Sequence, residues 1–351
     1  MRGRILSILA TCALASTAAT PPAELFSPLI PQKVLAAFKA LPNPIKYPQY
    51  TTTTGTWQFF SPDTWTSGFF PVTGYEVNTR RTLCGATPAN GLGSADWVAL
   101  ARAASNGLIS LENGNGQGHD QGFLSFPFVE ELLLNPNNAT AKTAILAFSK
   151  ILSGRFNSVV GATRSWDSSD PNNFQVIIDN MMNLELLFHA ANLTGDASLI
   201  KIATTHADTT IKNHIRDDGN QNYLVTARRL AKYFLDNIPS DGIVPWDFNA
   251  PLTPAPRPAD SSAATIAANG LLLLAKYETS STAAQSYTDS AIDVRPFHQL
   301  GQPFHELTHP LMQLLNKMTG LAWNPSWQSL LSNGTVNKPA NNQLTGTVYG
   351  A

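Results

Sequence analysis

Charged residues are scarce in this chain, and their scarcity argues against several classes of protein. Only 13% of the 351 residues are Asp, Glu, Lys or Arg, and the formal net charge is −1. Nucleic-acid binding requires a cationic surface, so we predict no nucleic-acid partner. Hydrophobic residues make up 43% of the chain, which predicts a folded protein with a large core and not a disordered one.

Cysteine and long apolar runs are also scarce. The two cysteines are Cys12, in an N-terminal segment that we expect to be removed, and Cys84, which then has no partner for a disulfide. No later run reaches the roughly 18 apolar residues of a membrane span, so we predict no membrane partner. Glycine-rich nucleotide-binding motifs and the G-x-S-x-G motif of serine hydrolases are absent as well.

The first residues have the pattern of a secretory signal peptide. Arg2 and Arg4 precede an apolar run from Ile5 to Ala15, and small residues suited to cleavage lie at its end and just beyond it. We therefore expect residues 1–20 to be a signal peptide, residues 21–351 to be a single domain, and the protein to be secreted.

Helical patterns recur along the chain, whereas strand-like alternation is nearly absent. The helices that these patterns predict span residues 96–111, 141–156, 174–191, 197–213, 226–237, 261–277 and 311–318. Thr140, Asp196 and Asp260 are expected to cap the helices that follow them. Hairpins of such helices bury little surface alone and must stack. The sequence therefore predicts an all-α ring of helical hairpins, with the helix 174–191 in its inner layer.

The segment from Phe174 to His189 is the most informative part of the chain. Its apolar residues would fall on nearly every side of a helix, which predicts a helix wrapped on most sides by protein. Asp179, Asn180 and Asn183 lie within it. Because a buried carboxylate resists ionisation, we expect a raised pKa for Asp179, as a general acid requires. The alternative is an Asp179 paired with a backbone group or an arginine.

Four further side chains are suited to a polar or sugar-binding site. His119 and Asp120 lie between glycines in a loop that follows a predicted helix, where functional residues are common. Trp65 and Trp166 stand beside small or polar residues, as do tryptophans that stack on sugar rings. The alternatives are that Asp120 serves a turn or a helix cap and that the tryptophans pack in the core.

The segment from His305 to His309 matches the zinc-binding pattern H-E-x-x-H. That pattern requires both histidines on one helix, and Pro310 disfavours helical geometry at His309 directly before it. We therefore predict no metal site there, and a metalloprotease is the last alternative that the sequence leaves open.

Taken together, these segments resemble glycoside hydrolase family 88, the unsaturated glucuronyl hydrolases, in their fungal form. The matching blocks occur in the order of the family and are Trp65–Pro71, Gly118–Phe123, Arg164–Asp167, Val176–Leu184, Ile202–Ala207, Asn213–Gly219, Asp241–Phe248 and Asp260–Ala264. The resemblance implies an (α/α)6 barrel. It also implies a hydrolase that removes an unsaturated uronic acid from the non-reducing end of lyase-generated oligosaccharides, by hydration of the C4=C5 double bond.

The resemblance also implies roles for individual residues. Asp179 would be the general acid that protonates the sugar ring and the base that activates water, and Asp120 would assist it. His119, Trp65 and Trp166 would line the sugar subsite. No metal or organic cofactor is implied, and the partner is an unsaturated uronic-acid oligosaccharide.

The chain departs from the family pattern in several places. After Gly219 it runs directly to the next family helix, with Tyr223 near the position of a family histidine, so a block of about one helical hairpin is missing. Residues 72–94 and 294–320 do not match, and the chain stops before the family pattern ends. We therefore expect an incomplete barrel with exposed apolar faces, reduced stability and low activity. The alternatives are an unsaturated rhamnogalacturonyl hydrolase and a catalytically impaired sugar-binding paralogue.

Overall fold

Helices dominate the fold in this computed structural model, which describes residues 21–170, 172–214, 223–239, 242–245, 247–249, 259–292 and 314–332. The helices are α1 (Leu29–Lys39), α2 (Phe69–Cys84), α3 (Trp97–Ser105), α4 (Gln121–Leu134), α5 (Ala139–Ser153), α6 (Asn180–Asn183), α7 (Glu185–Thr194), α8 (Ala197–His214), α9 (Tyr223–Asn237), α10 (Ser261–Tyr277), α11 (Ser281–Ile292) and α12 (Leu314–Ala322). The 3-10 helices are η1 (Ala23–Phe26) and η2 (Asn106–Asn113). Two short antiparallel sheets pair β1 (Tyr47–Thr51) with β2 (Trp57–Phe60) and β3 (Phe156–Asn157) with β4 (Ala162–Thr163).

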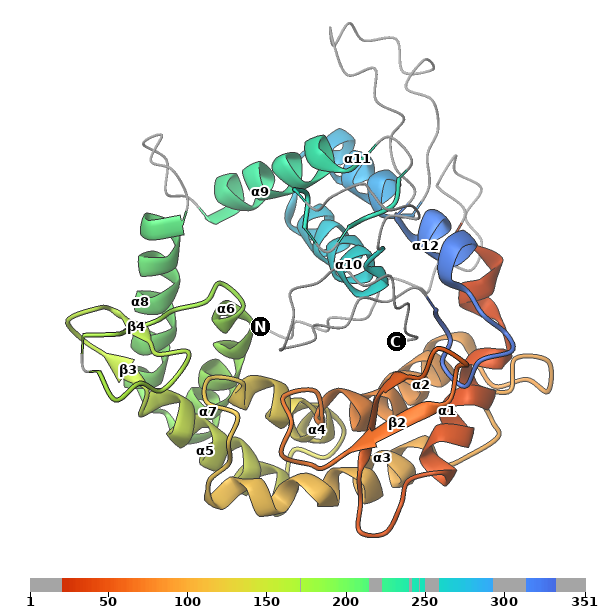
Figure 1. The fold of residues 1–351 in the computed structure, drawn as a ribbon, viewed down its shortest axis with the longest axis horizontal. Helices are drawn as coiled ribbons and strands as arrows, with labels where there is room; N and C mark the ends of the chain where they lie inside the picture. The colour runs from red at the N-terminus through yellow and green to blue at the C-terminus, as the bar shows by residue number, and fades with distance from the viewer. Residues whose placement is uncertain are drawn as a thin grey trace, which may run out of the picture.

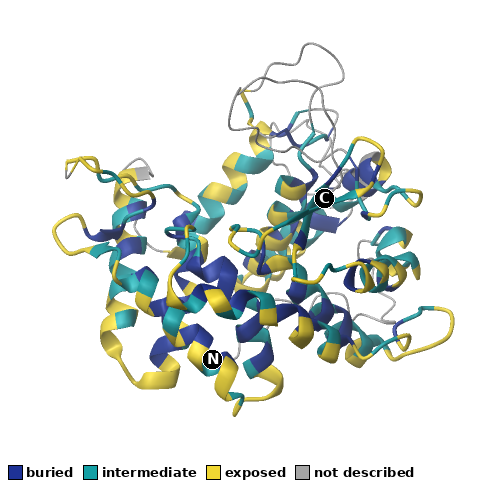
Figure 2. Cartoon of the chain, turned by 60° about the horizontal axis from the view of Figure 1, so that its bottom comes forward, coloured by how far each residue is buried: buried dark blue, intermediate teal, exposed yellow. Residues whose placement is uncertain are grey.

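The helices follow one another around a ring in chain order, from α1 to α12 (Figure 1). Successive helices pack against each other, as in the pairs α2–α3, α4–α5, α7–α8 and α10–α11. Helices α4, α6 and α10 lie nearest the centre of the ring in this view. Buried residues concentrate where the helices face one another, and the exposed ones lie on the outer turns (Figure 2).

Three apolar clusters stabilise the described part of the ring, and the two larger ones lie in its two halves. The first lies among α1 to α8, and its fully buried residues include Leu108, Leu124, Phe148 and Leu187. The second joins α9 to α12 around residues such as Leu271 and Leu314. Among the described residues, no helix combines the length and the apolar character needed to cross a bilayer.

The last described residues, which follow α12, contact α1 near the start of the described chain. The Nζ of Lys33 on α1 donates hydrogen bonds to the backbone carbonyls of Asn324 (2.6 Å), Trp327 (2.7 Å) and Ser329 (2.7 Å), which follow α12. Because these carbonyls converge on one ammonium group, the segment after α12 is fixed against α1. This contact closes the ring.

Most helices predicted from the sequence are present. Helix α10 has the predicted bounds, and the Asp260 Oδ1 accepts from the backbone N–H of Ala263 (3.0 Å), as expected of its cap. The Asp196 cap on α8 is also confirmed, since its Oδ1 accepts from the Ser198 N–H (2.8 Å). The predicted Thr140 cap is wrong, because Asn138 caps α5.

The predicted continuous helix 174–191 is wrong at its start. Residues 172–179 are not helical, α6 spans four residues, and α7 begins after Leu184. Ile178 and Met182 are 54% and 46% exposed, so the segment is not wrapped on all sides. The proposed signal peptide, the H-E-x-x-H segment and residues 215–222 lie outside the described residues.

Candidate active site

Asp120 lies directly before α4, at the end of a loop that hydrogen bonds hold in place. Gly118 has a φ of +57°, a conformation that glycine adopts without strain. The Asp120 N–H donates to the Gln117 carbonyl (3.0 Å), and the Gln117 side chain donates to the Asp63 carboxylate (2.8 Å). The Asp120 side chain makes no cap hydrogen bond to α4, so its interpretation as a helix cap is wrong. Its carboxyl group lies beside His119.

Asp179 lies directly before α6, on a segment that pairs with the loop after β4. The Ser165 N–H donates to the Gln175 carbonyl (2.8 Å), and the Ile177 N–H donates to the Ser165 Oγ (2.9 Å). These bonds hold the backbone of 175–177 against a distant loop instead of within a helix. This explains why the helix begins only after Asp179.

The two asparagines of α6 anchor Asp179 to the rest of the site. Asn180 is fully buried and donates from its Nδ2 to the carbonyl (3.0 Å) and Oγ1 (2.8 Å) of Thr163 on β4. Asn183 is also fully buried, and its Oδ1 accepts from the Phe123 N–H on α4 (3.1 Å). A side chain at Gly122 would place its Cβ 2.6 Å from the Asn183 Cα, so α6 packs directly on the α4 backbone.

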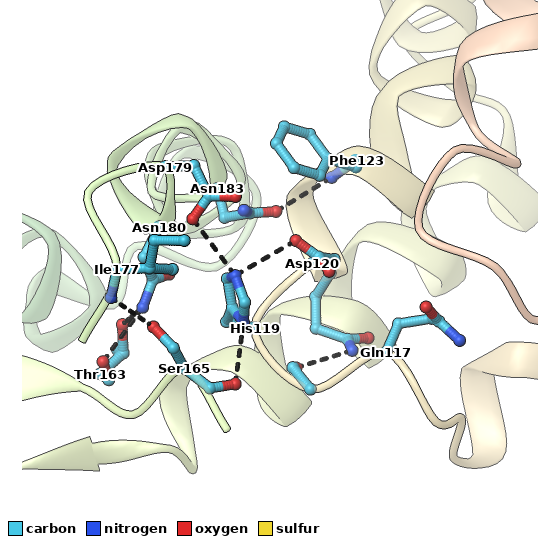
Figure 3. Close-up of polar contacts among 12 residues, drawn as sticks. Gln117, His119, Asp120, Phe123, Thr163, Ser165, Ile177, Asp179, Asn180 and Asn183 are labelled. Atoms are coloured by element: carbon cyan, nitrogen blue, oxygen red, sulfur yellow. Dashed lines mark hydrogen bonds and ion pairs between the residues drawn. The ribbon is translucent and has the colours of Figure 1, made fainter. Parts of the chain in front are cut away.

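His119 brings the two aspartates together (Figure 3). Its Nε2 lies 3.4 Å from the Asp120 Oδ1 and 3.4 Å from the Asp179 Oδ1. Its Nδ1 lies 2.8 Å from the Ser165 carbonyl, which can only accept, so Nδ1 carries a proton. The His119 side chain is 6% exposed, and its orientation is therefore set by these contacts. Two carboxyl groups share one imidazole nitrogen.

Burial and neighbouring charges shift the pKa values of Asp120 and His119 in opposite directions. Burial raises the pKa of Asp120 to about 6, and the nearby Asp179 adds to the rise, while His119, Asn183 and Arg155 oppose it. Burial alone would lower the pKa of His119. The hydrogen bond to Asp179, the charge of Asp120 and the Ser165 carbonyl outweigh it, so the pKa of His119 is raised above its ordinary value. The site therefore favours an imidazolium between the two carboxyl groups.

Asp179 is less buried than the sequence predicts. Its side chain is 41% exposed, so Asp179 is partly buried and not enclosed within a helix as we predicted. Its Oδ1, which faces His119, is shielded from solvent, and the exposed area lies on the other side-chain atoms. Asp179 thus presents one oxygen to the protein and leaves the other available to a bound molecule.

The two predicted tryptophans flank this group. Trp166 lies edge-on to His119, with ring centroids 5.8 Å apart. Trp65 packs against Phe123, one turn after Asp120, with ring centroids 6.0 Å apart. Both indoles are 48% exposed, so the alternative that they are core residues is wrong. The structure thus gathers Asp120, Asp179 and Trp166 around His119, and Trp65 lies beyond Phe123 on the adjoining helix; the roles of all five stay predictions.

Arg155 and Ser165 are parts of the site that we did not single out from the sequence. The Ser165 carbonyl accepts from both His119 and the Arg155 Nη2 (3.1 Å). Neither residue belongs to a local sequence pattern that marks it, because Arg155 bonds to backbone in the next loop and Ser165 bonds to His119, 46 residues away. His119, Asp120 and Asp179 are also the one group among the described residues whose metal-ligand atoms lie within 4.8 Å of one another. A shared proton suffices to explain these contacts.

Known proteins with similar sequences share one activity class. No protein-family profile matches the chain. The chain is 31% identical over 284 residues to the unsaturated glucuronyl hydrolase of Formosa agariphila, an alignment that covers 66% of each chain. It is 28% identical over 225 residues to the unsaturated glucuronyl hydrolase of Bacillus sp., covering 49% of this chain and 59% of that protein. The matched region thus spans less than two thirds of these relatives.

Solved structures agree with the fold. The unsaturated glucuronyl hydrolase of Bacillus sp. GL1 superposes with a TM-score of 0.70 at 21% identity, covering 89% of both chains. A variant of the Streptococcus agalactiae enzyme, solved in complex with dGlcA-GalNAc6S, superposes with a TM-score of 0.62 at 17% identity, covering 96% of this chain and 89% of that one. These structures are (α/α)6 barrels, which confirms the predicted fold class.

Proposed function

We propose that the chain, which belongs by sequence and structure to the family of unsaturated glucuronyl hydrolases, removes an unsaturated glucuronic or related uronic acid from lyase-generated oligosaccharides. The observation that carries this proposal is the arrangement of Asp120 and Asp179 on the single Nε2 of His119. One carboxyl group of this set is half-exposed, so it can reach a bound sugar. The relatives' activity supports the same reaction class.

Asp179 is the proposed proton donor and acceptor. Its accessible oxygen delivers a proton to C4 of the unsaturated ring, and positive charge then develops at C5, where the ring oxygen stabilises it. The carboxylate that results accepts a proton from water as the water oxygen adds to C5. The hemiketal formed in this way opens and releases the rest of the oligosaccharide. Asp179 ends in its starting protonation state.

Asp120 and His119 support this step. Asp120, as a carboxylate, accepts hydrogen bonds from water or substrate hydroxyls, so activity should fall as the pH drops through the Asp120 pKa of about 6. His119 holds a positive charge between the two carboxyl groups, which keeps both of them in place. Trp65 and Trp166 offer half-exposed indole faces for the sugar ring.

The decisive experiment follows the double bond itself. An unsaturated disaccharide made by a polysaccharide lyase is incubated with the protein in D2O. Hydration removes the ultraviolet absorbance of the conjugated double bond and places deuterium on C4. Asp179→Asn should lower kcat/KM by roughly 100- to 10,000-fold. Release of the second sugar with the absorbance intact would instead indicate ordinary attack at C1 and contradict the proposal.

A substrate panel separates the remaining alternatives. Unsaturated glucuronyl and unsaturated rhamnogalacturonyl disaccharides are compared under the same conditions. Preference for the rhamnogalacturonyl disaccharide would assign the chain to the unsaturated rhamnogalacturonyl hydrolases. Binding of either sugar without turnover would favour an impaired sugar-binding paralogue.

We also propose that the chain is a fungal-type member that lacks a helical hairpin after α8. Support comes from apolar side chains that lie exposed along single faces of α9 and α10. They are Leu230 (54%), Tyr233 (59%), Ile266 (58%), Leu273 (42%) and Tyr277 (62%). A hairpin packed there would cover such faces. Sequencing the transcript tests this proposal. A coding segment that is present in the transcript but absent from this chain would supply the hairpin.

Secretion is a separate proposal that rests on residues 1–20. Expression of the full chain in a eukaryotic host, followed by N-terminal sequencing of the protein in the medium, tests it. A mature N-terminus near residue 20 is expected. Retention of an uncleaved chain inside the cells would contradict it.

A further inference from the structure

Arg155 is a cationic side chain whose hydrogen bonds lead to the candidate active site. It lies just after α5, and its side chain is only 12% exposed. Its Nε donates to the Arg164 carbonyl (2.8 Å), and its Nη2 donates to the Ser165 carbonyl (3.1 Å). Its guanidinium also meets the carboxylate of Asp167 (3.1 Å), which is 80% exposed. The guanidinium therefore holds two successive carbonyls of one loop.

The Ser165 carbonyl connects this guanidinium to the imidazole. A carbonyl oxygen has two lone pairs, and here one partner is the Arg155 Nη2 and the other is the His119 Nδ1. The same loop carries Trp166, which lies edge-on to His119. Without the Arg155 guanidinium, the loop would lose two hydrogen bonds, and the positions of the His119 imidazole and the Trp166 indole would be less restricted.

We propose that Arg155 is a positioning residue for the sugar site, acting through the Ser165 carbonyl on His119 and Trp166. The inference rests on the proposed function, since it assigns a part in the same site. The carbonyl fixes the Nδ1 proton of His119 and so directs Nε2 to the two aspartates. The charged groups that act on Asp120 are His119, Asp179 and Arg155, so the guanidinium also helps to keep Asp120 ionised.

Two substitutions separate the charge of Arg155 from its geometry. Arg155→Met removes both, so KM should rise at least about tenfold. The acid limb of the kcat/KM profile should also move to higher pH, because Asp120 loses a nearby cation. Arg155→Lys keeps the charge but lacks the fork that spans two carbonyls. Its acid limb should stay near that of the wild type while KM still rises.

Asp167→Asn is the matched control. It removes the exposed ion pair of Arg155 and leaves both carbonyl bonds in place. KM should stay within about twofold of the wild-type value, since exposed ion pairs contribute little. The acid limb should be unchanged or move slightly to lower pH, which is the opposite direction from Arg155→Met. An equal rise of KM in Asp167→Asn and Arg155→Met would overturn the role of the carbonyl bonds.

A measurement on His119 tests the proposal without turnover. In 15N-histidine-labelled protein, with the His119 signals identified by their absence in His119→Gln, Nδ1 should remain protonated across the titration. In Arg155→Met the Nδ1 and Nε2 shifts should move toward tautomer averaging. A wild-type His119 that is neutral and protonated on Nε2 would overturn the proposal, even if Arg155→Met failed to fold. Inactivity of the wild type on every unsaturated disaccharide would reject the proposed function and leave this result standing.

Discussion

The charge of Asp120, which the proposed activity requires, lowers the stability of the folded protein. Its folded pKa of about 6 lies above the ordinary value of 3.8. Between these values the native state binds more protons than the unfolded state, so stability falls as the pH rises through this interval. Above about pH 6 the full cost of the buried charge is present. A site that needs a buried carboxylate is therefore less stable than one without it.

This cost gives a first prediction. Asp120→Asn should raise the free energy of unfolding at pH 7 by up to about 3 kcal/mol, because each pKa unit corresponds to about 1.4 kcal/mol. The difference from the wild type should vanish below about pH 4, where both proteins carry a neutral group. Denaturant unfolding at several pH values measures it. A gain in stability that stays constant across pH would show that the charge of Asp120 is not its source.

Gly122 gives a second prediction at the residue scale. A Cβ there would lie 2.6 Å from the Asn183 Cα and 2.9 Å from its carbonyl oxygen, which are backbone atoms that cannot rotate away. Gly122→Ala should therefore push α6 from α4, cost about 1–3 kcal/mol and lower activity by separating Asp120 from Asp179.

Gly270 on α10 provides the matched control for Gly122. Among the described residues, no atom outside its chain neighbours and the backbone of its own helix lies within 4 Å of a Cβ added at Gly270. Gly270→Ala should stabilise the helix by up to about 1 kcal/mol and leave activity unchanged. Thermal unfolding and kcat/KM are measured for both variants. A Gly122→Ala protein as stable and active as the Gly270→Ala protein would contradict direct packing of α6 on α4.

At the scale of the elements, one carboxylate joins several helices. Glu131 on α4 is 3% exposed. It accepts hydrogen bonds from Tyr75 on α2 (3.0 Å), from Arg102 on α3 (2.8 and 2.9 Å) and from Asn138, the cap of α5 (2.8 Å). Burial alone would raise the pKa of Glu131, but these donors outweigh it and hold the pKa below its ordinary value. The charged form is thus the stabilising one, which is the opposite of Asp120.

The third prediction follows from the lowered pKa of Glu131. Glu131→Gln should lower the free energy of unfolding by about 1–3 kcal/mol at neutral pH. The loss is limited because Arg102 is half-exposed, so solvent screens its ion pair with Glu131. Because the folded pKa is depressed, wild-type stability is present above about pH 4.5 and is lost as the pH falls, so the two proteins should converge in acid. Glu185→Gln, at a side chain that is 48% exposed, is the control and should differ little from the wild type. Convergence at high pH instead of low pH would contradict the assignment.

The elements also mark how far the sequence predicts this structure. Helix α10 is predicted because Asp260 caps a regular apolar pattern. Helix α4 escapes prediction because Pro127 lies inside it, and α11 because its small and polar residues give a weak apolar stripe. The start of 174–191 is wrong because the hydrogen bonds of Ser165 with distant backbone outweigh local helical preference. Arg155 could not be identified because its bonds go to backbone carbonyls, which leave no pattern in the side chains of the sequence, whereas Asp120 and Asp179 stood out as polar residues in distinctive local settings.

At the scale of the whole molecule, the ring depends on the contact between its two ends. Besides the three carbonyls held by Lys33, the Gln328 N–H donates to the Gly55 carbonyl (2.9 Å), and the Gln328 Oε1 accepts from the Trp57 N–H (2.7 Å). The segment after α12 is therefore attached both to α1 and to the β1–β2 hairpin. Its attachment joins the second apolar core, which includes α12, to the part of the ring that holds α1 and the β1–β2 hairpin.

The last prediction tests whether this contact holds the ring closed. Lys33→Ala leaves three carbonyls without their ammonium partner, so we expect a loss of about 2–3 kcal/mol, less than the sum of three charged hydrogen bonds because water replaces part of them. Hydrogen exchange at the Gln328 amide should accelerate, since its bond to Gly55 depends on the same docking. Lys39→Ala, an exposed lysine at the end of the same helix, should leave both quantities unchanged. If Lys33→Ala lowered stability while the Gln328 amide stayed protected, Lys33 would stabilise α1 alone, and the ring would be closed by other contacts.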